Sequence, residues 1–568
     1  MAAAGQPLTG RGAGRWLRVA PVVTLGLLGI PVLAGLAGTL APAFGWLPAL
    51  GRTEPSLDAW RTLFASPGFG TAWQVTLLSG WLATVLSLLL ALGWLSLVHD
   101  RPWARRLSGP LAPLLATPHS ALAIGFAFLV APSGWLVRWV SPGLTGWSLP
   151  PDVATVGHPS GLALVAGLML KEVPYLMLMM LGAVGQTRAT AQLAAARAMG
   201  YGPVTAALKV LVPQVYRQVR LPVMAVLAFS LTVVDVALIL GPTHPPTLAA
   251  WAVQEFQHPD TQRYFPAAAA AVLLLVMVVA SLVVWRLAEI VVSRWGRAWV
   301  ERGSRDGMAA TLALAAGRGA ALLQLLAALG LAGLAVWSLA HSWRYPQVWP
   351  AEWSARQWLQ QSSQLSGPLM STVGIGLATT LLAAALVVAC LENESTHRRR
   401  PASLAPLYLP LLVPQVAFLF GAQVLLVRMG LDGTAAAVVW AHLVFVLPYL
   451  FLSLADPWRA FDRRYERSAA SLGASRWRTF WRIKLPILAR PLWLASAVGF
   501  GVSVGLYLPT LFAGAGRVAT LTTEAVTLSG GADRRVIGIW ALLQAALPLL
   551  AYAAALWLPA GRPRRSKA

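Results

Sequence analysis

The chain has 568 residues, of which 57% are hydrophobic and only 11% are charged, and its formal net charge is +24. A soluble domain carries about 25% charged residues, so this composition excludes an ordinary globular protein and indicates that most of the chain faces lipid. The positive charge does not indicate nucleic acid as a partner, because the arginines stand in short clusters between apolar runs, as the positive-inside rule requires. The single cysteine, Cys390, excludes an internal disulfide and fits no metal-binding spacing.

The apolar runs and the arginine clusters between them predict an all-α polytopic membrane protein with about twelve transmembrane helices. In chain order, the expected spans lie near residues 19–43, 71–98, 111–131, 161–185, 221–241, 267–288, 319–340, 371–391, 404–427, 434–455, 491–513 and 536–558. The first run, preceded by arginines, is also compatible with a cleaved signal peptide, but its length favours an uncleaved span. Every dense basic cluster then falls on one side, so both termini are expected to be cytoplasmic.

The second half of the sequence repeats the first. The pairs at an offset of 296 positions are Thr76 and Thr372, Gly80 and Gly376, Pro118 and Pro414, and Gly125 and Gly421. Later pairs, such as Pro174 and Pro448, stand 274 positions apart. These offsets predict two homologous six-helix halves, 1–288 and 319–568, joined by a basic cytoplasmic linker over 289–318. Parallel repeats of this kind are related by an axis along the membrane normal, and a pathway is expected at their interface.

One polar loop occurs in both halves, over residues 187–220 and 456–490. In each copy small residues lead to a glycine, and a proline follows thirteen positions later, from Gly200 to Pro213 and from Gly473 to Pro486. We expect the glycine to take the left-handed geometry that ends a helix, which a side chain resists. The proline can begin the next span, where a missing N–H is tolerated.

The second copy also has an aromatic face. Trp477, Phe480 and Trp481 stand at positions i, i+3 and i+4 of a short helix, with arginines around them. Such a face suits docking into a groove on a soluble partner. The alternative is an interfacial helix that lies on anionic lipid. Two copies with the same glycine-to-proline spacing favour a symmetric partner.

The repeated stretch resembles the "EAA" loop of the membrane subunits of bacterial ABC importers. Ala195 and Ala196 match the alanine pair of that motif in the first copy, and Ala469 matches its second alanine in the second copy. The acidic position departs from the motif, because Glu466 stands one residue early and Leu193 replaces it in the first copy. The residues that the resemblance and the aromatic face assign to ATPase coupling are Ala195, Ala196, Gly200, Pro213, Glu466, Ala469, Gly473, Trp477, Phe480 and Pro486.

The fused form, with PPTL at 245–248 and YLPTLFAGAGRVATLTTEAV at 507–526, is similar to the permeases of the thiamine, ferric-iron and polyamine importer group, and most to the thiamine-type branch. The resemblance implies a type I ABC importer permease fold in the bacterial inner membrane, surrounded by lipid. It also implies two cytoplasmic ABC ATPase subunits at the loops and a periplasmic binding protein outside. The substrate would be thiamine, a related small solute or ferric iron.

The sequence has no P-loop motif, so ATP and magnesium are expected in the partner ATPase, and no cofactor, catalytic residue or metal site is expected in this chain. Ionisable residues at membrane depth are costly and are candidates for the substrate pathway. They are Asp235, His442, Lys171 and Glu172. For His442 a packing role is the simpler interpretation, and Lys171 and Glu172 can instead neutralise each other at a helix break. The alternative function is an ion-gradient-driven secondary transporter, which explains the buried charges but not the two matched loops.

Overall fold

The computed structural model describes residues 13–99, 114–187, 189–305, 307–397, 407 and 410–557. It is 78% helical, and the strands of the described part are one short antiparallel pair, β1 (Ala340–Ser342) and β2 (Glu352–Trp353). The all-α fold class is therefore confirmed. Both chain ends lie outside the described residues, as do parts of the spans expected over 111–131 and 404–427.

Each expected span coincides with one helix or with two consecutive helices. The long helices of the first half are α1 (Ala13–Ala43), α3 (Phe69–Val98), α5 (His119–Val130), α7 (Leu162–Val184), α10 (Val212–Thr232) and α13 (Tyr264–Glu301). Those of the second half are α14 (Gly307–Leu339), α15 (Arg356–His397), α16 (Gln415–Arg428), α17 (Ala435–Arg459), α21 (Ala489–Gly505) and α24 (Arg534–Trp557).

When helices are judged by length and hydropathy alone, the number of membrane spans is smaller than the expected twelve. Within the described residues nine helices are long and apolar enough to cross a membrane, or ten if the bent pair Arg476–Ile487 and Ala489–Gly505 is one span. Helix α16 has only 14 residues, and α10 carries Arg217 and Arg220 among its 21 residues. The expected count of about twelve is thus not confirmed, because neither helix is among the nine that are long and apolar enough.

Two spans that the sequence presented as continuous are broken at matching places. Helix α10 ends at Thr232, and the short helix α11 (Asp235–Leu240) follows. Helix α21 ends at Gly505, and α22 (Leu508–Gly514) follows, 273 positions later. The connecting residues Val233 and Leu506 have extended ψ angles of 137° and 109°, which end the helical hydrogen bonding.

The internal repeat extends to single hydrogen bonds. The backbone N–H of Leu248 donates to Thr76 Oγ1 at 2.9 Å, and the N–H of Leu521 donates to Thr372 Oγ1 at 2.9 Å. The two acceptors are the threonines that the sequence aligned, and the two donors begin the matching helices α12 (Leu248–Phe256) and α23 (Leu521–Ser529). Each half therefore bonds the start of the same short helix to the same long helix.

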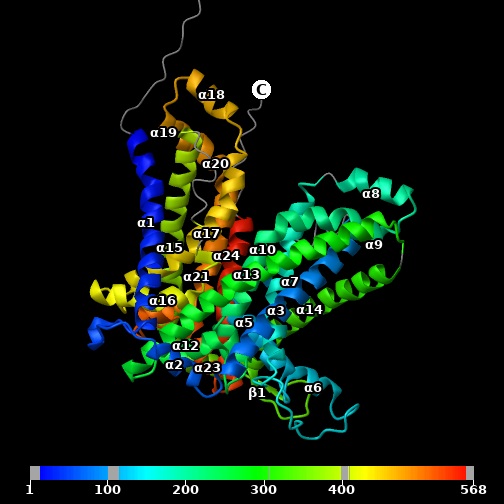
Figure 1. Cartoon of the computed structure of the whole chain (residues 1–568), viewed down its shortest axis with the longest axis vertical. Helices are drawn as coiled ribbons and strands as arrows, with labels where there is room; N and C mark the ends of the chain where they lie inside the picture. Colours follow the sequence, from blue (N-terminus) through cyan, green and yellow to red (C-terminus); the bar gives the residue numbers. More distant parts are fainter. Residues whose placement is uncertain are drawn as a thin grey trace, which may run out of the picture.

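The first helix of each half packs on the other half. Helix α1 crosses α16 and lies along α15, while α14 crosses α5 and lies along α3 (Figure 1). Close approach at the two crossings depends on glycine pairs, Gly38 with Gly421 and Gly330 with Gly125. A Cβ at Gly421 would stand 2.1 Å from the Gly35 carbonyl oxygen, and one at Gly125 would stand 2.8 Å from Gly330. The sequence did not predict that the first helix of each half packs against the other half.

We expect Gly421→Ala to lower the thermal stability of the purified protein. The new methyl group would overlap the backbone of α1, and overpacking of this kind costs about 1–3 kcal/mol. The measurement is the unfolding temperature in mild detergent. Gly26→Ala on α1 is the matched control, because no described residue comes within 4 Å of its Cβ position. That variant should be neutral or slightly stabilised, since alanine favours a helix over glycine by about 1 kcal/mol. Equal unfolding temperatures of the two variants would contradict the predicted crossing.

The basic linker expected over 289–318 is largely helical. Helix α13 continues to Glu301 and α14 begins at Gly307, so only residues 302–306 lie between the two helices. The segment contains no proline, and arginine, alanine and leucine favour helices, so each helix extends beyond its apolar span. The two halves are joined by a tight turn rather than by a long loop.

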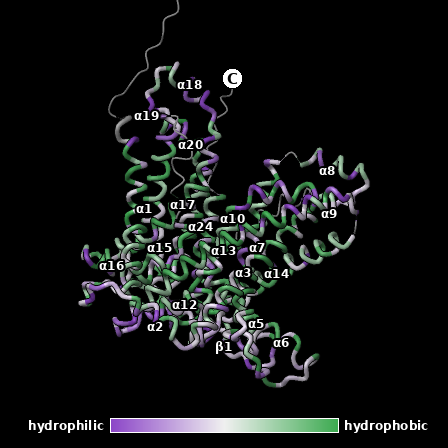
Figure 2. The backbone as a smooth tube through the Cα atoms, in the orientation of Figure 1, coloured by the Kyte–Doolittle hydropathy of each residue, from purple (hydrophilic) through white to green (hydrophobic). Residues whose placement is uncertain are grey.

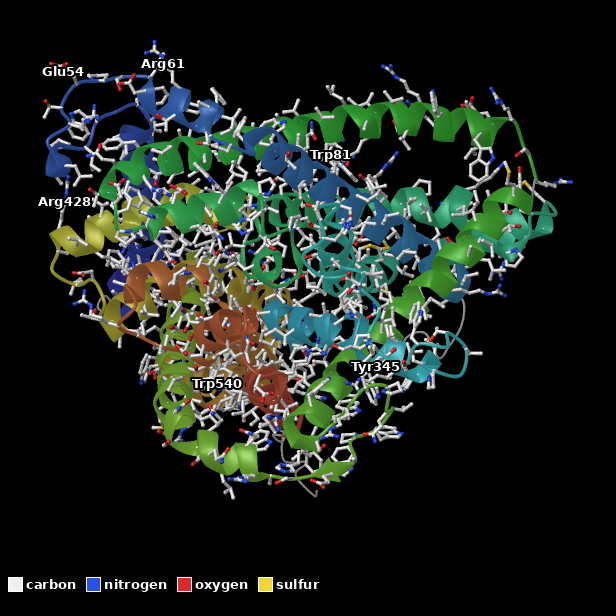
Figure 3. The ribbon with its side chains drawn as sticks, turned by 90° about the horizontal axis from the view of Figure 1, so that it is seen from below. Glu54, Arg61, Trp81, Tyr345, Arg428 and Trp540 are labelled. Carbon is white, nitrogen blue, oxygen red and sulfur yellow. The ribbon has the colours of Figure 1, made fainter. Side chains whose placement is uncertain are left out.

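The two repeated loops lie at the tips of two diverging groups of long helices, which we call the arms. Helices α1, α15 and α17 belong to one arm, and α3, α10 and α14 belong to the other (Figure 1). Figure 1 places α18 (Arg464–Ser471) and α19 (Arg476–Thr479) at one tip and α8 (Ala189–Ala198) and α9 (Pro203–Ala206) at the other. Helices α2 (Asp58–Ala65), α6 (Trp135–Val140), α12 and α23 gather at the opposite end. Figure 2 shows hydrophobic residues along the arms and hydrophilic ones at the tips. Seen from below, Glu54, Arg61 and Arg428 lie at the margin of the opposite end (Figure 3).

Candidate functional site

Both repeated loops have the helix–glycine–helix geometry that the sequence predicted. Gly200 follows α8 with φ +88°, and Gly473 follows α18 with φ +78°. In each loop the residue after the glycine donates its N–H back to a helix carbonyl, from Ala474 to Ala469 at 2.9 Å in the second copy. These bonds close the helix as a left-handed C-terminal cap does. The left-handed glycines are therefore confirmed.

A π-helical turn follows the second short helix in each loop. The turns are Ala207–Leu211 and Phe480–Lys484, again 273 positions apart. Pro213 is the second residue of α10, and Pro486 is the second residue of α20 (Leu485–Ile487), positions where a missing N–H is tolerated. In the second copy the chain bends by 70° between Ile487 and Ala489 before the long helix α21 begins.

The inward faces of α8 and α18 differ in charge. Ala196 and Ala469 occupy equivalent buried positions, whereas Ala195 is exposed. Leu193 is buried in the first loop, and Glu466 takes the equivalent place in the second. The Glu466 carboxylate accepts a hydrogen bond from Lys484 Nζ at 3.2 Å, and the Glu466 side chain remains 34% exposed.

The aromatic face of the second loop is divided. Trp477 and Trp481 are 68% and 50% exposed, and their ring centroids lie 5.4 Å apart. Phe480 is half-buried, with its ring 6.3 Å from that of Trp458. The Phe480 ring also stacks on that of Trp477, with centroids 6.4 Å apart, so it lies between α17 and the exposed tryptophans. Its role as a docking contact stays a prediction. The first loop has Val204, Ala207 and Leu208 at the equivalent positions.

A second candidate site lies where α5, α7 and α11 meet. Lys171 Nζ donates to the Thr117 carbonyl oxygen at 2.5 Å, and His119 Nε2 lies 3.8 Å from Glu172 Oε1. Asp235 is the first residue of α11, where an acidic side chain suits the positive end of a helix, and it interacts electrostatically with Lys171. The structure thus brings together three of the four residues that the sequence proposed for a pathway.

Two tyrosines of the second half complete this charged cluster. Tyr449 of α17 lies near Glu172, and Tyr507, at the helix break before α22, lies near Asp235. The Tyr449 side chain is 38% exposed. We define the charged cluster as His119, Lys171, Glu172, Asp235, Tyr449 and Tyr507. The sequence analysis missed His119 and both tyrosines, although Tyr449 follows the aligned Pro448.

His442 belongs to a different set of contacts. Its side chain is 2% exposed, and its two ring nitrogens lie 2.8 Å from the hydroxyls of Ser503 and Thr510. Both nitrogens are therefore satisfied inside the second half, as in a packing histidine. A polar contact that the sequence analysis missed crosses the halves, where Gln544 Nε2 donates to Ser120 Oγ at 2.7 Å.

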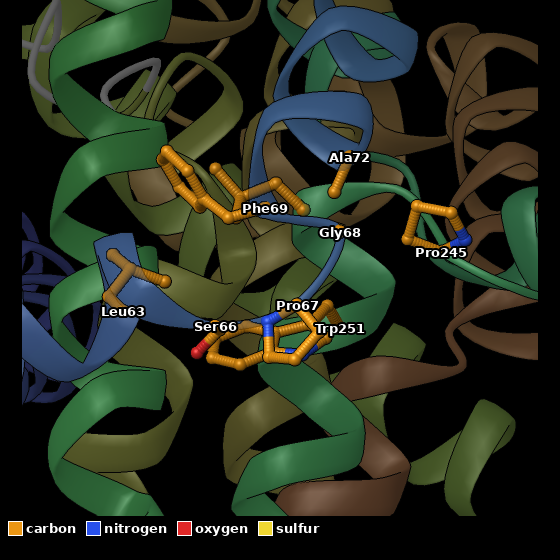
Figure 4. Close-up of a pocket in the computed structure, with 9 residues that line it drawn as sticks. Leu63, Ser66, Pro67, Gly68, Phe69, Ala72, Pro245 and Trp251 are labelled. Carbon is orange, nitrogen blue, oxygen red and sulfur yellow. The ribbon is translucent and has the colours of Figure 1, made fainter.

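A small apolar pocket lies near the opposite end of the molecule (Figure 4). It is lined by residues of the α2–α3 turn and of α12, among them Leu63, Phe69 and Trp251. Pro245 covers Gly68 closely, since a Cβ there would stand 2.9 Å from the proline Cβ. Its lining contains none of the residues of the charged cluster, and it has no charged side chain to recognise an ionic substrate.

Comparisons with known proteins find permeases of transport systems. The inner membrane ABC transporter permease protein YnjC of Escherichia coli is 32% identical over 502 residues, which cover 88% of this chain and 90% of that relative. The molybdenum transport system permease protein ModB of Mycobacterium tuberculosis is 33% identical over 193 residues, 31% of this chain and 70% of the relative. The probable sulfate transport system permease protein cysT of Chlorokybus atmophyticus is 36% identical over 75 residues, 13% of this chain and 25% of the relative. No family model matches the chain.

The matches differ in extent. The first relative spans both halves, while the molybdenum permease is mostly covered by a match of 193 residues, which is shorter than either half. The chain is therefore a transport subunit and not itself an enzyme. It belongs to the ABC transporter permease family.

Proposed function

We propose that this chain forms the translocation pathway of an ATP-driven importer and that its two repeated loops couple the pathway to two cytoplasmic ATPase subunits. The observation that carries the proposal is the pair of matched loops at the tips of the two arms, each with a left-handed glycine and a π-helical turn. Two equivalent loops on one chain suit two copies of one partner. ATP and magnesium would bind in those subunits.

The proposed orientation places the tips of the arms in the cytoplasm of a bacterium and the chain in the inner membrane. Basic residues concentrate in the loops at the tips, as the positive-inside rule requires. Both termini are then cytoplasmic. A periplasmic binding protein would deliver substrate at the end that carries α2, α6, α12 and α23.

The charged cluster is the proposed passage for substrate. It joins side chains of both halves next to two helix breaks at matching positions, and broken helices at the interface of repeats bind substrates in other transporters. The cluster contains Glu172 and Asp235 against Lys171, which suits a cationic or neutral solute. The substrate we propose is thiamine or a related small solute, with ferric iron as a further candidate. His442 is not part of this passage.

The test of coupling is purification of the tagged chain from its native membrane in mild detergent, with identification of what co-purifies. We expect a P-loop ATPase that is lost when Gly200 and Gly473 are both replaced by valine. The matched control is the pair Gly51→Val and Gly430→Val, which strains two left-handed glycines away from the loops. Their φ angles are +74° and +67°, and no described residue comes within 4 Å of either Cβ position.

The opposite result would favour a different class of transporter. A wild-type chain that purifies without an ATPase, yet moves solute in vesicles under an ion gradient and without ATP, would support a secondary transporter. The matched loops would then have no assigned partner, and the proposed coupling would be wrong.

A further inference from the structure

Each coupling loop contains a buried lysine in its π-helical turn. Lys209 and Lys484 are 8% and 2% exposed, and they are two of only four lysines in the chain. Burying an ammonium group costs free energy unless its N–H groups donate hydrogen bonds. The acceptors of those hydrogen bonds therefore show which segments the lysine holds together. Each Nζ also lies about 5 Å from two aromatic ring centroids, within cation–π range. The rings are those of Tyr201 and Trp299 for Lys209, and of Trp458 and Phe461 for Lys484.

Lys484 joins the second loop to the end of α15. Its Nζ donates to Glu466 Oε1 at 3.2 Å within the loop, and to Glu392 Oε2 at 2.7 Å and Ser395 Oγ at 3.2 Å on α15. Glu392 and Ser395 belong to the last two turns of that helix, whose 42 residues are continuous from Arg356. At 1.5 Å per residue the helix is about 60 Å long and reaches the opposite end of the molecule.

Lys209 joins the first loop to the turn between the halves. Its Nζ donates to the Ser304 carbonyl oxygen at 2.7 Å and to the Trp299 carbonyl oxygen at 3.2 Å. In the reverse direction, Arg305 Nη2 donates to the Met199 carbonyl oxygen at 2.7 Å, next to Gly200. The first loop is therefore bonded to the tight turn that connects the long helices α13 and α14.

We infer that Lys484 and Lys209 are positioning residues that transmit displacement of the coupling loops to long helices reaching the opposite end of the molecule. The inference rests on the proposed function, since the displacement comes from the ATPase subunits. The two links differ in chemistry. The second is an ionic triad of one lysine and two carboxylates, whereas the first is a lysine bound to neutral carbonyls. Loss of the lysine thus leaves two unpaired carboxylates only in the second loop.

The experiment measures movement and ATP hydrolysis in the same complex. Spin labels are placed at Leu359→Cys on α15 and Leu144→Cys in the first half, which are 75% and 86% exposed, after Cys390→Ala removes the native thiol. The distance between them is measured with and without ATP in the complex with its ATPase. We expect Lys484→Met to lower the nucleotide-dependent population shift by about 2- to 30-fold while ATP hydrolysis continues. Lys484→Arg keeps the charge and should restore the shift.

A triple variant separates transmission from simple stability. Lys484→Met combined with Glu392→Gln and Glu466→Gln leaves no unpaired carboxylate, so a purely structural role predicts a normal shift. Transmission predicts that the shift stays reduced although the complex assembles. Arg318→Met, at an exposed cation of α14, is the matched control and should behave as wild type.

Two outcomes would overturn the inference. One is an unchanged shift in Lys484→Met, and the other is full recovery in the triple variant. Failure of the proposed function is distinguishable from both, because the wild-type chain would then capture no ATPase. For the first loop, Lys209→Met should also reduce the shift, and wild-type behaviour of that variant would remove Lys209 from the inference.

Discussion

Gly473→Val is expected to lower ATP-driven transport strongly while the protein still inserts and folds. Gly473 has φ +78°, and a left-handed conformation costs about 1–2 kcal/mol for a residue with a side chain. Valine is worse than most residues because it is branched at Cβ. No described residue lies within 4 Å of the Cβ position, so the cost comes from the backbone and should be relieved by a change in loop shape rather than by unfolding. A cost of this size lowers the population of the native loop conformation, relative to a distorted one, about tenfold.

The measurement is uptake by vesicles that contain the chain with its ATPase, beside the amount of protein in the membrane. Gly473→Asn is the informative companion, because asparagine tolerates the left-handed region, and it should retain much of the activity. Gly430→Val is the matched control, since it strains a glycine with φ +67° away from the loops and should leave uptake unchanged. Wild-type uptake by Gly473→Val would show that the loop geometry is not needed for coupling.

The glycines of the loops were predictable because their role is local. The thirteen-residue interval between glycine and proline fixes a helix end and a helix start, and neither depends on distant partners. The same holds for the long helices, which follow from apolar runs longer than the thickness of a membrane. The internal repeat was visible because threonines, glycines and prolines recur at fixed offsets. The aligned Thr76 and Thr372 accept equivalent hydrogen bonds in the two halves.

Features that depend on tertiary contacts could not be predicted. Gly38 and Gly421 are visible in the sequence, but nothing in it shows that they face each other. Their contact lets α1, the first helix of the chain, pack against α16 of the second half. The partial burial of Phe480 depends on a tertiary contact, because its ring packs 6.3 Å from that of Trp458 on α17. The partner of Lys484 is Glu392, 92 positions earlier in the chain, so no spacing rule could identify the pair.

Part of the charged cluster could be predicted from the sequence, and part depends on tertiary contacts. Lys171, Glu172 and Asp235 could be proposed from the sequence because ionisable residues in apolar runs are rare. Their convergence with Tyr449 and Tyr507 depends on how the halves pack. It also depends on the helix break that places Asp235 at the start of α11.

Asp235→Asn should lower uptake of a cationic substrate strongly without affecting the ATPase. A hydrogen bond to a charged group contributes about 1.5–3 kcal/mol, so we expect a loss of roughly 10- to 100-fold in uptake of radiolabelled thiamine at limiting concentration. The side chain lies on α11, away from both coupling loops, so the purified ATPase should bind the variant normally. Asp58→Asn, which changes an exposed carboxylate near Arg61, is the matched control and should transport normally.

A double variant makes the prediction specific to the cluster. Asp235 and Lys171 lie close enough to interact electrostatically, and the effects of mutations at interacting residues are in general not additive. Lys171→Met alone leaves the two carboxylates of Glu172 and Asp235 without a lysine to offset their charge. Lys171→Met combined with Asp235→Asn leaves the carboxylate of Glu172 alone. If the cluster acts on substrate through its net charge, the double variant should regain part of the uptake that Asp235→Asn loses. Additive losses would instead mean that the two residues serve the protein separately, and the cluster would no longer be the proposed passage.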